Sequence, residues 1–105
     1  KQKKAKCIIS VCKVDHPLEW TNKLEKNLSM NNFLDKSLHG RRSQDFKVSY
    51  RINGAIYIAD ISEVMKHKTM FLKNKSYAYI MKKNESIDID EPLDLEFANF
   101  LIKKL

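Results

Sequence analysis

The feature that most constrains this chain is an apolar run close to its start, CIISVCKV from Cys7 to Val14. The run is almost continuously apolar and carries several β-branched residues, a pattern typical of a strand buried on both faces of a parallel sheet. A strand of this kind needs other strands beside it and helices over it, so the rest of the chain must supply both.

The second half of the chain supplies alternating strands and helices. Two more strands are predicted, over Gly54 to Ile61 (GAIYIADI) and over Tyr77 to Met81 (YAYIM). Between them, Ile61 to Lys68 is predicted to form a short helix, with Asp60 or Ser62 as its N-cap. The alternation predicts an α/β fold with a parallel or mixed sheet and flanking helices.

The last element is predicted to be an amphipathic helix. Pro92 suits its first turn, Asp90 or Glu91 can cap it, and further acidic residues lie near its start. Apolar residues recur on one face at helical spacing, namely Leu93, Phe97, Phe100, Leu101 and Leu105. We expect this face to cover one side of the sheet.

The stretch from Trp20 to about Tyr50 has no clean period, because its apolar residues are interleaved with lysine, asparagine and serine. A structureless stretch of this length is unusual inside a compact domain. It is therefore either an excursion that packs on something else or a disordered segment.

The charge and the motif content of the chain bear on which kinds of partner it can bind. The formal net charge of +7 suits an anionic partner, and it equally suits the solvated surface of a lysine-rich chain. No helix-turn-helix, zinc-finger spacing or RNA-binding aromatic pair is present, so no nucleic-acid partner is expected. The apolar runs are too short to span a bilayer, and KQKKAK at the start is not followed by a signal-peptide cleavage site.

The two cysteines, Cys7 and Cys12, fall in the first predicted strand. Their odd separation directs them to opposite faces, so they cannot pair with each other. Two buried thiols are typical of a reducing compartment, and we expect a cytoplasmic protein with no membrane partner.

Asp88 and Asp90 in the segment SIDID are the best candidates for chemistry. In an extended segment both carboxylates project to one side while Ile87 and Ile89 point to the other. A hard divalent cation relieves the repulsion between two adjacent carboxylates, and Mg²⁺ commonly takes one or two carboxylates with phosphate oxygens and water. The alternative from spacing alone is a polar edge, with Asp90 acting only as a helix cap.

Arg51 and Asn53 in YRINGAIYI form a second candidate site. Arginine can bind a carboxylate through a bidentate fork, asparagine offers both a donor and an acceptor, and Gly54 permits close backbone approach. The alternative is an ordinary strand start that contains a turn residue. The histidines lack metal-ligand spacing, and no nucleophile motif is present, so covalent catalysis is not indicated.

Taken in order, these segments resemble one family. The string consists of DHPL at Asp15 to Leu18, RRSQD at Arg41 to Asp45, YRINGAIYI, YAYIM and SIDID. It is similar to the C-terminal half of the CMP-sialic acid synthetases (acylneuraminate cytidylyltransferases), and the resemblance covers nearly the whole chain from about Val11. NGAIYI and SIDID at this separation form its most specific combination.

The resemblance implies a nucleotidyltransferase-type mixed sheet and a reaction that transfers CMP from CTP to a sialic acid with release of pyrophosphate. It implies Mg²⁺ as cofactor, with Asp88 and Asp90 as the catalytic, metal-holding carboxylates. It implies that the sialic acid is bound by Arg51, Asn53, Tyr57, Phe71 and Arg42, with Met70 beside Phe71 keeping the pocket apolar. It also implies that residues 20–50 pack against a second subunit, as a dimerisation excursion of a homodimer.

Three departures from the family pattern matter. The basic, glycine-containing nucleotide-binding loop of the N-terminal half is absent, so this chain alone is expected to be inactive. RRSQD carries an extra serine, so the family arginine matches Arg41 or Arg42, and we assign it to Arg42. One residue is inserted between Phe71 and Tyr79.

Two other functions fit the same residues. One is a cytidylyltransferase for a related nonulosonic acid such as legionaminic acid. The other is a non-catalytic dimerisation or binding module.

Overall fold

The structure, a computed structural model, describes residues Lys4–Leu105. These form two compact units, one of residues up to Cys12 together with Arg51–Leu105, and one of Lys13–Tyr50. The first three residues of the lysine-rich start lie outside the described residues, so the structure says nothing of that part of the KQKKAK segment.

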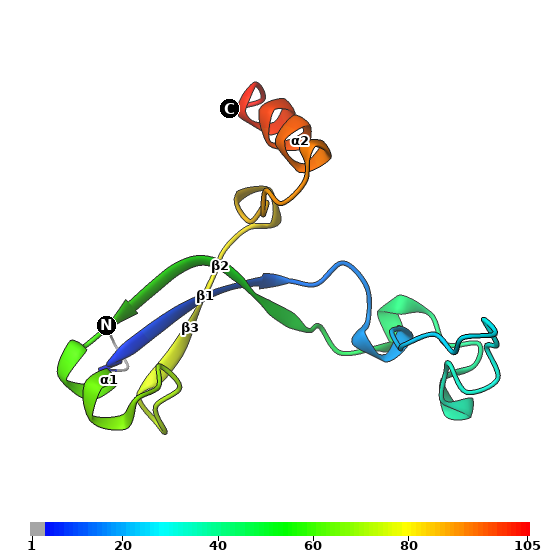
Figure 1. The fold of residues 1–105 in the computed structure, drawn as a ribbon, viewed down its shortest axis with the longest axis horizontal. Helices are drawn as coiled ribbons and strands as arrows, with labels where there is room; N and C mark the ends of the chain where they lie inside the picture. Colours follow the sequence, from blue (N-terminus) through cyan, green and yellow to red (C-terminus); the bar gives the residue numbers. More distant parts are fainter. Residues whose placement is uncertain (1–3) are drawn as a thin grey trace. The chain divides into compact units, whose positions relative to one another are not determined.

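A three-stranded mixed sheet with strand order β2-β1-β3 is the centre of the first unit (Figure 1). Its strands are β1 (Cys7–Lys13), β2 (Tyr50–Ala59) and β3 (Ser76–Ile80). β3 runs parallel to β1, in a register from Cys7↔Ser76 to Val11↔Ile80. β2 runs in the opposite direction along the other edge of β1 (Figure 1), and past its end the Asp60 N–H donates to the Lys6 carbonyl over 2.7 Å. The predicted mixed α/β architecture is confirmed.

β1 lies between the other two strands and contributes most of the core, as its apolar sequence predicts. Cys7, Ile9, Ser10 and Cys12 are all buried, and Leu72 from the loop before β3 joins them. Both cysteine thiols are free, as the opposite-face argument predicts.

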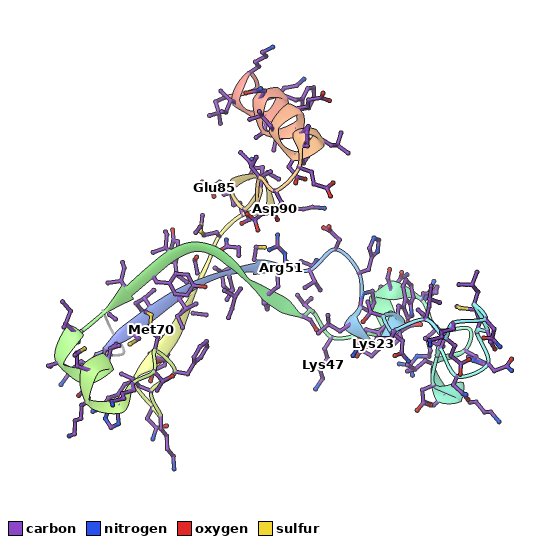
Figure 2. All side chains as sticks on the ribbon, in the orientation of Figure 1. Lys23, Lys47, Arg51, Met70, Glu85 and Asp90 are labelled. Carbon is purple, nitrogen blue, oxygen red and sulfur yellow. The ribbon has the colours of Figure 1, made fainter. Side chains whose placement is uncertain are left out.

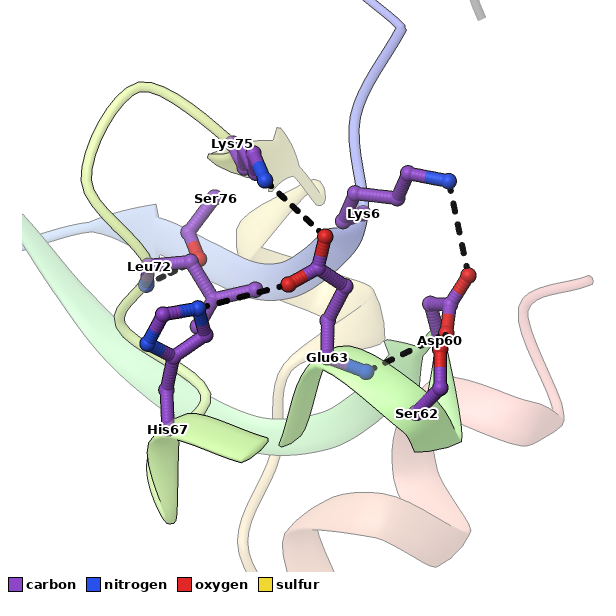
Figure 3. A network of polar contacts seen from close by, with 8 residues as sticks. All are labelled: Lys6, Asp60, Ser62, Glu63, His67, Leu72, Lys75 and Ser76. Atoms are coloured by element: carbon purple, nitrogen blue, oxygen red, sulfur yellow. Dashed lines mark hydrogen bonds and ion pairs between the residues drawn. The ribbon is translucent and has the colours of Figure 1, made fainter. Parts of the chain in front are cut away.

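The helix α1 (Ile61–His67) follows β2 directly, and Asp60 is its N-cap. The Asp60 carboxylate accepts hydrogen bonds from the Glu63 N–H over 3.3 Å and from the Ser62 hydroxyl over 2.6 Å. Two ion pairs join the start of this helix to neighbouring segments (Figure 3): Lys6 lies 3.4 Å from Asp60, and Lys75 lies 2.9 Å from Glu63. The helix is therefore held both to the start of β1 and to the loop before β3.

The helix α2 (Pro92–Ile102) forms as predicted, with Pro92 in its first turn and Glu91 as its N-cap. The predicted packing of its apolar face on the sheet is not observed, since within Lys4–Leu105 none of its residues is buried. Phe97 and Phe100 are about half exposed, whereas Ala98 and Leu101 border a hollow beside the short 3₁₀ turn η4 (Lys83–Glu85). Helical spacing predicted the helix correctly, but within the described residues the sheet does not bury its apolar face.

The second unit contains no strand or α-helix of its own between Val14 and Ser49, a span that the structure describes in full. It is built from three 3₁₀ turns: η1 (Leu18–Trp20), η2 (Lys36–Leu38) and η3 (Ser43–Asp45). The Trp20 and Phe46 rings meet edge to face with centroids 5.9 Å apart. Several large apolar side chains are exposed, among them Leu24, Leu28 and Met30. The absence of a clean period in the sequence thus corresponds to an absence of regular structure.

None of the helices in the described part of the chain has the length and apolar character needed to cross a membrane.

Candidate functional site

A buried polar network connects β1, β2 and the segment that leads to Asp88. The Ser10 hydroxyl donates to Asn53 Oδ1 over 2.6 Å, and Asn53 Nδ2 donates to Ser86 Oγ over 3.0 Å. The Ser86 hydroxyl in turn donates to the Lys82 carbonyl over 2.7 Å. Ser10, Asn53 and Ser86 are only 0%, 8% and 4% exposed, so these hydrogen bonds are made away from water, where losing a partner is costly.

The Asn53-Gly54 pair shapes β2 around this network. Gly54 has a φ of +73°, a left-handed conformation that residues with a Cβ rarely adopt. The next two backbone N–H groups then find side-chain acceptors: Ala55 donates to Asn53 Oδ1 over 3.2 Å and Ile56 donates to Ser10 Oγ over 2.8 Å. A Cβ at this position would meet no atom within 4 Å, so lack of space is not what selects glycine here. The positive φ is the feature that favours it.

Arg51 reaches the same segment from β2. Its Nη2 donates to the Ser86 carbonyl over 3.4 Å, while the residue remains largely exposed. Arg51 and Asn53 therefore lie on one face of β2 and converge on Ser86, two residues before Asp88 in the sequence. Figure 2 shows Arg51 on β2 and Asp90 on the segment between η4 and α2.

Asp88 and Asp90 are both exposed and lie outside any strand, so the extended SIDID segment is not part of the sheet. Glu91 is the N-cap residue of α2, and the carboxylate that accepts from the backbone at this point belongs to Asp94 in the first turn. Asp94 Oδ2 accepts from the Asp90 N–H over 3.0 Å and from the Glu91 N–H over 2.9 Å. The Asp90 side chain is thus not the helix cap that the alternative interpretation required. Among the described residues, neither the Asp88 nor the Asp90 carboxylate takes part in a hydrogen bond or ion pair.

The Asp88 and Asp90 carboxylates could supply only two of the ligands of a cation. Between Lys4 and Leu105 there is no group of three or more histidine, cysteine or acidic side chains that could hold a metal. Two unpartnered carboxylates nevertheless match the usual contribution of protein to a Mg²⁺ ion, which retains waters and takes phosphate oxygens for its other positions.

Phe71 lies apart from Arg51 and Asn53. It borders an apolar hollow of about 160 Å³ together with Ile9, Val11 and Ile52, and is itself 65% exposed. Since neighbouring residues of a strand point to opposite faces, Ile52 and Asn53 place this hollow and the polar network on different faces of the sheet. Tyr57 is 52% exposed on β2. The structure thus brings together two of the five predicted sugar-binding residues.

Arg42 belongs to the second unit. Its guanidinium is 4.0 Å from Asp45, and its side chain is 72% exposed. The neighbouring Arg41 instead lies over the Phe46 ring, 5.4 Å from its centroid, and donates to the Asp45 carbonyl. Both arginines thus have partners within the second unit, and the assignment of the family arginine to Arg42 stays a prediction.

The DHPL and RRSQD segments meet within the second unit. They border a hollow of about 390 Å³, which is lined by Asp15, His16, Ser43 and Gln44 and by residues next to them. The motif segments are thus neighbours in space as well as parts of one ordered string.

Ser10 and Ser86 are not among the site residues that the sequence predicts. Ser10 is a polar residue inside an otherwise apolar strand, and a buried hydroxyl needs a partner, so it was a detectable signal. Ser86 is adjacent to the predicted carboxylates, but nothing local in the sequence marks it as buried.

A comparison with curated proteins finds a protein similar in sequence to this chain. The chain is 36% identical over 96 residues to the N-acylneuraminate cytidylyltransferase of Escherichia coli O18:K1:H7 (strain RS218 / NMEC). The predicted resemblance to the cytidylyltransferases is confirmed. The match covers 90% of this chain and 22% of the Escherichia coli cytidylyltransferase, so the chain spans about a fifth of that relative. No family model matches the chain.

The chain is thus similar in sequence to part of an N-acylneuraminate cytidylyltransferase. The similarity extends over nearly all of the chain and thus takes in most of the described residues. The three-stranded mixed sheet with its helices is consistent with a nucleotidyltransferase-type fold.

Proposed function

We propose that this chain is the C-terminal half of a cytidylyltransferase domain, part of an enzyme that transfers CMP from CTP to a sialic acid and releases pyrophosphate. The observation that carries the proposal is the convergence of Arg51 and Asn53 on Ser86, two residues before Asp88 in the sequence, in a chain similar to an N-acylneuraminate cytidylyltransferase.

Asp88 and Asp90 are the proposed holders of a Mg²⁺ ion. Their exposed carboxylates are not neutralised by any lysine or arginine of the described chain, so their negative charge is available to a cation. When bound, Mg²⁺ would neutralise charge on the phosphate oxygens of CTP. In this proposal the chain contributes the two carboxylates, and water and phosphate oxygens supply the other ligands.

Arg51 is the proposed partner of the sialic acid carboxylate. Its guanidinium has one hydrogen bond, over 3.4 Å, to the Ser86 carbonyl, and its remaining N–H groups are available for a bidentate contact. We assign Tyr57, Phe71 and Arg42 to the same substrate, with Phe71 and its apolar hollow suited to the N-acyl group.

The second unit is the proposed dimerisation excursion. It contains almost no buried residue of its own. Five large apolar side chains are each more than half exposed, namely Leu18, Leu24, Leu28, Met30 and Val48. Exposed large apolar side chains in such number are the kind of surface that an interface covers. Sedimentation of the purified chain at micromolar concentration is expected to show a homodimer, and a monomer at all concentrations would contradict this assignment.

CMP transfer is the test of the main proposal. In a chimera, this chain replaces the matching 96 residues of the Escherichia coli enzyme. We expect the chimera to consume CTP in the presence of Mg²⁺ and N-acetylneuraminate, and the isolated chain to consume none. A folded chimera that accepts only legionaminic acid would assign the alternative substrate. One that is inactive with both sugars would favour the non-catalytic module.

A further inference from the structure

We infer that Asn53 is a positioning residue, which fixes the acidic segment from Ile87 to Asp90 against the sheet through Ser86, rather than a residue that contacts the sugar. The inference rests on the proposed role of Asp88 and Asp90 as metal carboxylates. It assigns to Asn53, Ser10 and Ser86 a function that neither the sequence motifs nor the similarity to the relative indicates.

The first argument is that the Asn53 side chain has no free polar atom for a ligand. Its Oδ1 accepts from both the Ser10 hydroxyl over 2.6 Å and the Ala55 N–H over 3.2 Å. Its Nδ2 donates to Ser86 Oγ over 3.0 Å and lies 3.4 Å from the Met81 sulfur. With the residue only 8% exposed, a sugar hydroxyl would have to displace these contacts.

The second argument concerns where the network ends. Ser86 is 4% exposed, and it directly precedes a segment in which Asp88, Ile89 and Asp90 are all exposed. Hydrogen bonds engage each polar group of this residue: its hydroxyl accepts from Asn53 Nδ2 and donates to the Lys82 carbonyl, its N–H donates to the Lys83 carbonyl, and its carbonyl accepts from Arg51 Nη2. Ser86 is thus the last fixed point on the sheet side before the two carboxylates.

The third argument is that the carboxylates need such a fixed point. Their segment belongs to no strand, so ladder hydrogen bonds do not order it. On its other side the Asp94 carboxylate accepts from the backbone N–H groups of Asp90 and Glu91. The segment is therefore tied at both ends, and a cation that binds both carboxylates need not order the chain first.

The test uses the ¹⁵N-labelled chain with the substitution Ser86→Ala. Without metal, we expect the heteronuclear NOE values of residues 87–90 to fall while those of β1 and β3 stay unchanged. Ser86→Thr, which keeps the hydroxyl, is expected to restore the wild-type values. Ser62→Ala is the matched control, because it removes a serine hydroxyl that lies in α1 and donates to the N-cap Asp60, and it should leave residues 87–90 unaffected. Unchanged order in Ser86→Ala would overturn the inference.

A second readout separates this inference from the proposed function. Mn²⁺ is expected to broaden the amide signals of Asp88 and Asp90 in the wild-type chain, and Ser86→Ala should weaken the Mn²⁺ affinity on the order of tenfold. If Mn²⁺ has no effect on the wild type while Ser86→Ala still loosens residues 87–90, the metal role fails and the positioning role stands. If Ser86→Ala does not fold, slow exchange of the Asn53 side-chain amide protons in the wild type supports the network, and fast exchange overturns it.

Discussion

Replacing Asn53 by alanine is the most direct test of the buried network as a source of stability. The substitution leaves the Ser10 hydroxyl, which is 0% exposed, without an acceptor for its proton, and removes the acceptor of the Ala55 N–H. A buried donor without a partner costs about 1–3 kcal/mol, and the void left by the side chain adds to this. We therefore expect the free energy of unfolding to fall by about 2–4 kcal/mol, a large share of the roughly 5–15 kcal/mol that stabilises a typical domain.

Urea denaturation followed by far-ultraviolet circular dichroism measures this loss. Fluorescence is less suitable, because Trp20 is the single tryptophan and lies in the second unit. Asn84→Ala is the matched control: it removes the same side chain from an exposed position in η4 and should change stability by less than about 0.5 kcal/mol. In the Ser10→Ala background the further cost of Asn53→Ala should shrink, because the hydroxyl that would lose its acceptor is already gone. Equal effects of Asn53→Ala and Asn84→Ala would refute the reasoning.

Three further predictions concern catalysis, backbone geometry and charge. In the active chimera, Asp88→Asn or Asp90→Asn should lower kcat and be partly rescued by extra Mg²⁺, whereas Arg51→Ala should mainly raise the KM for the sugar; intact turnover in both aspartate variants would exclude the metal site. Gly54→Ala should destabilise the chain by about 1 kcal/mol or more and Gly54→Asn by less, measured by urea denaturation, because φ is +73° at this position; equal stability would contradict a left-handed conformation. The pKa of Glu63 is lowered by the hydrogen bond from Lys75, against the effect of burial and with help from the charges of Lys75, His67 and Lys66. The stability that the Glu63 carboxylate contributes is therefore complete above the ordinary glutamate pKa of roughly 4.3 and is lost as the pH falls through the lowered pKa. The stability difference between wild type and Glu63→Gln should disappear in acid, and a difference that persists there would refute the assignment.

The elements that the sequence predicted well are those whose pattern is local. β1 is apolar along nearly its whole length, and α1 has a capping aspartate at Asp60, so each was found within a residue or two of its observed bounds. β2 begins at Tyr50 rather than Gly54, because the residues Tyr50 to Asn53 mix aromatic, charged, apolar and polar types in a way that neither strand nor loop patterns describe.

The candidate site was predictable as a set of residues but not as a geometry. Arg51 and Asn53 were selected for their ability to contact a ligand, yet the structure engages the Asn53 amide with Ser10 and Ser86. These partners are 43 and 33 residues away in the sequence, so no local pattern could connect them. Only the strand order, which places β1 beside β2, makes Ser10 a neighbour of Asn53.

The exposed apolar residues show a different limit of sequence reasoning. In α2, helical spacing placed Leu93, Phe97 and Phe100 on one face, and the structure leaves them 71%, 47% and 54% exposed. Exposed apolar area costs about 25 cal/mol for each Å² that could be buried, so such a face favours contact with another surface. Periodicity therefore predicts that a helix has an apolar face, whereas the surface that covers it depends on long-range packing. The same holds for Leu28 in the second unit, which is 70% exposed and belongs to no periodic pattern. For that unit we have proposed a second copy of the chain as the covering surface, and sedimentation tests that proposal without reference to catalysis.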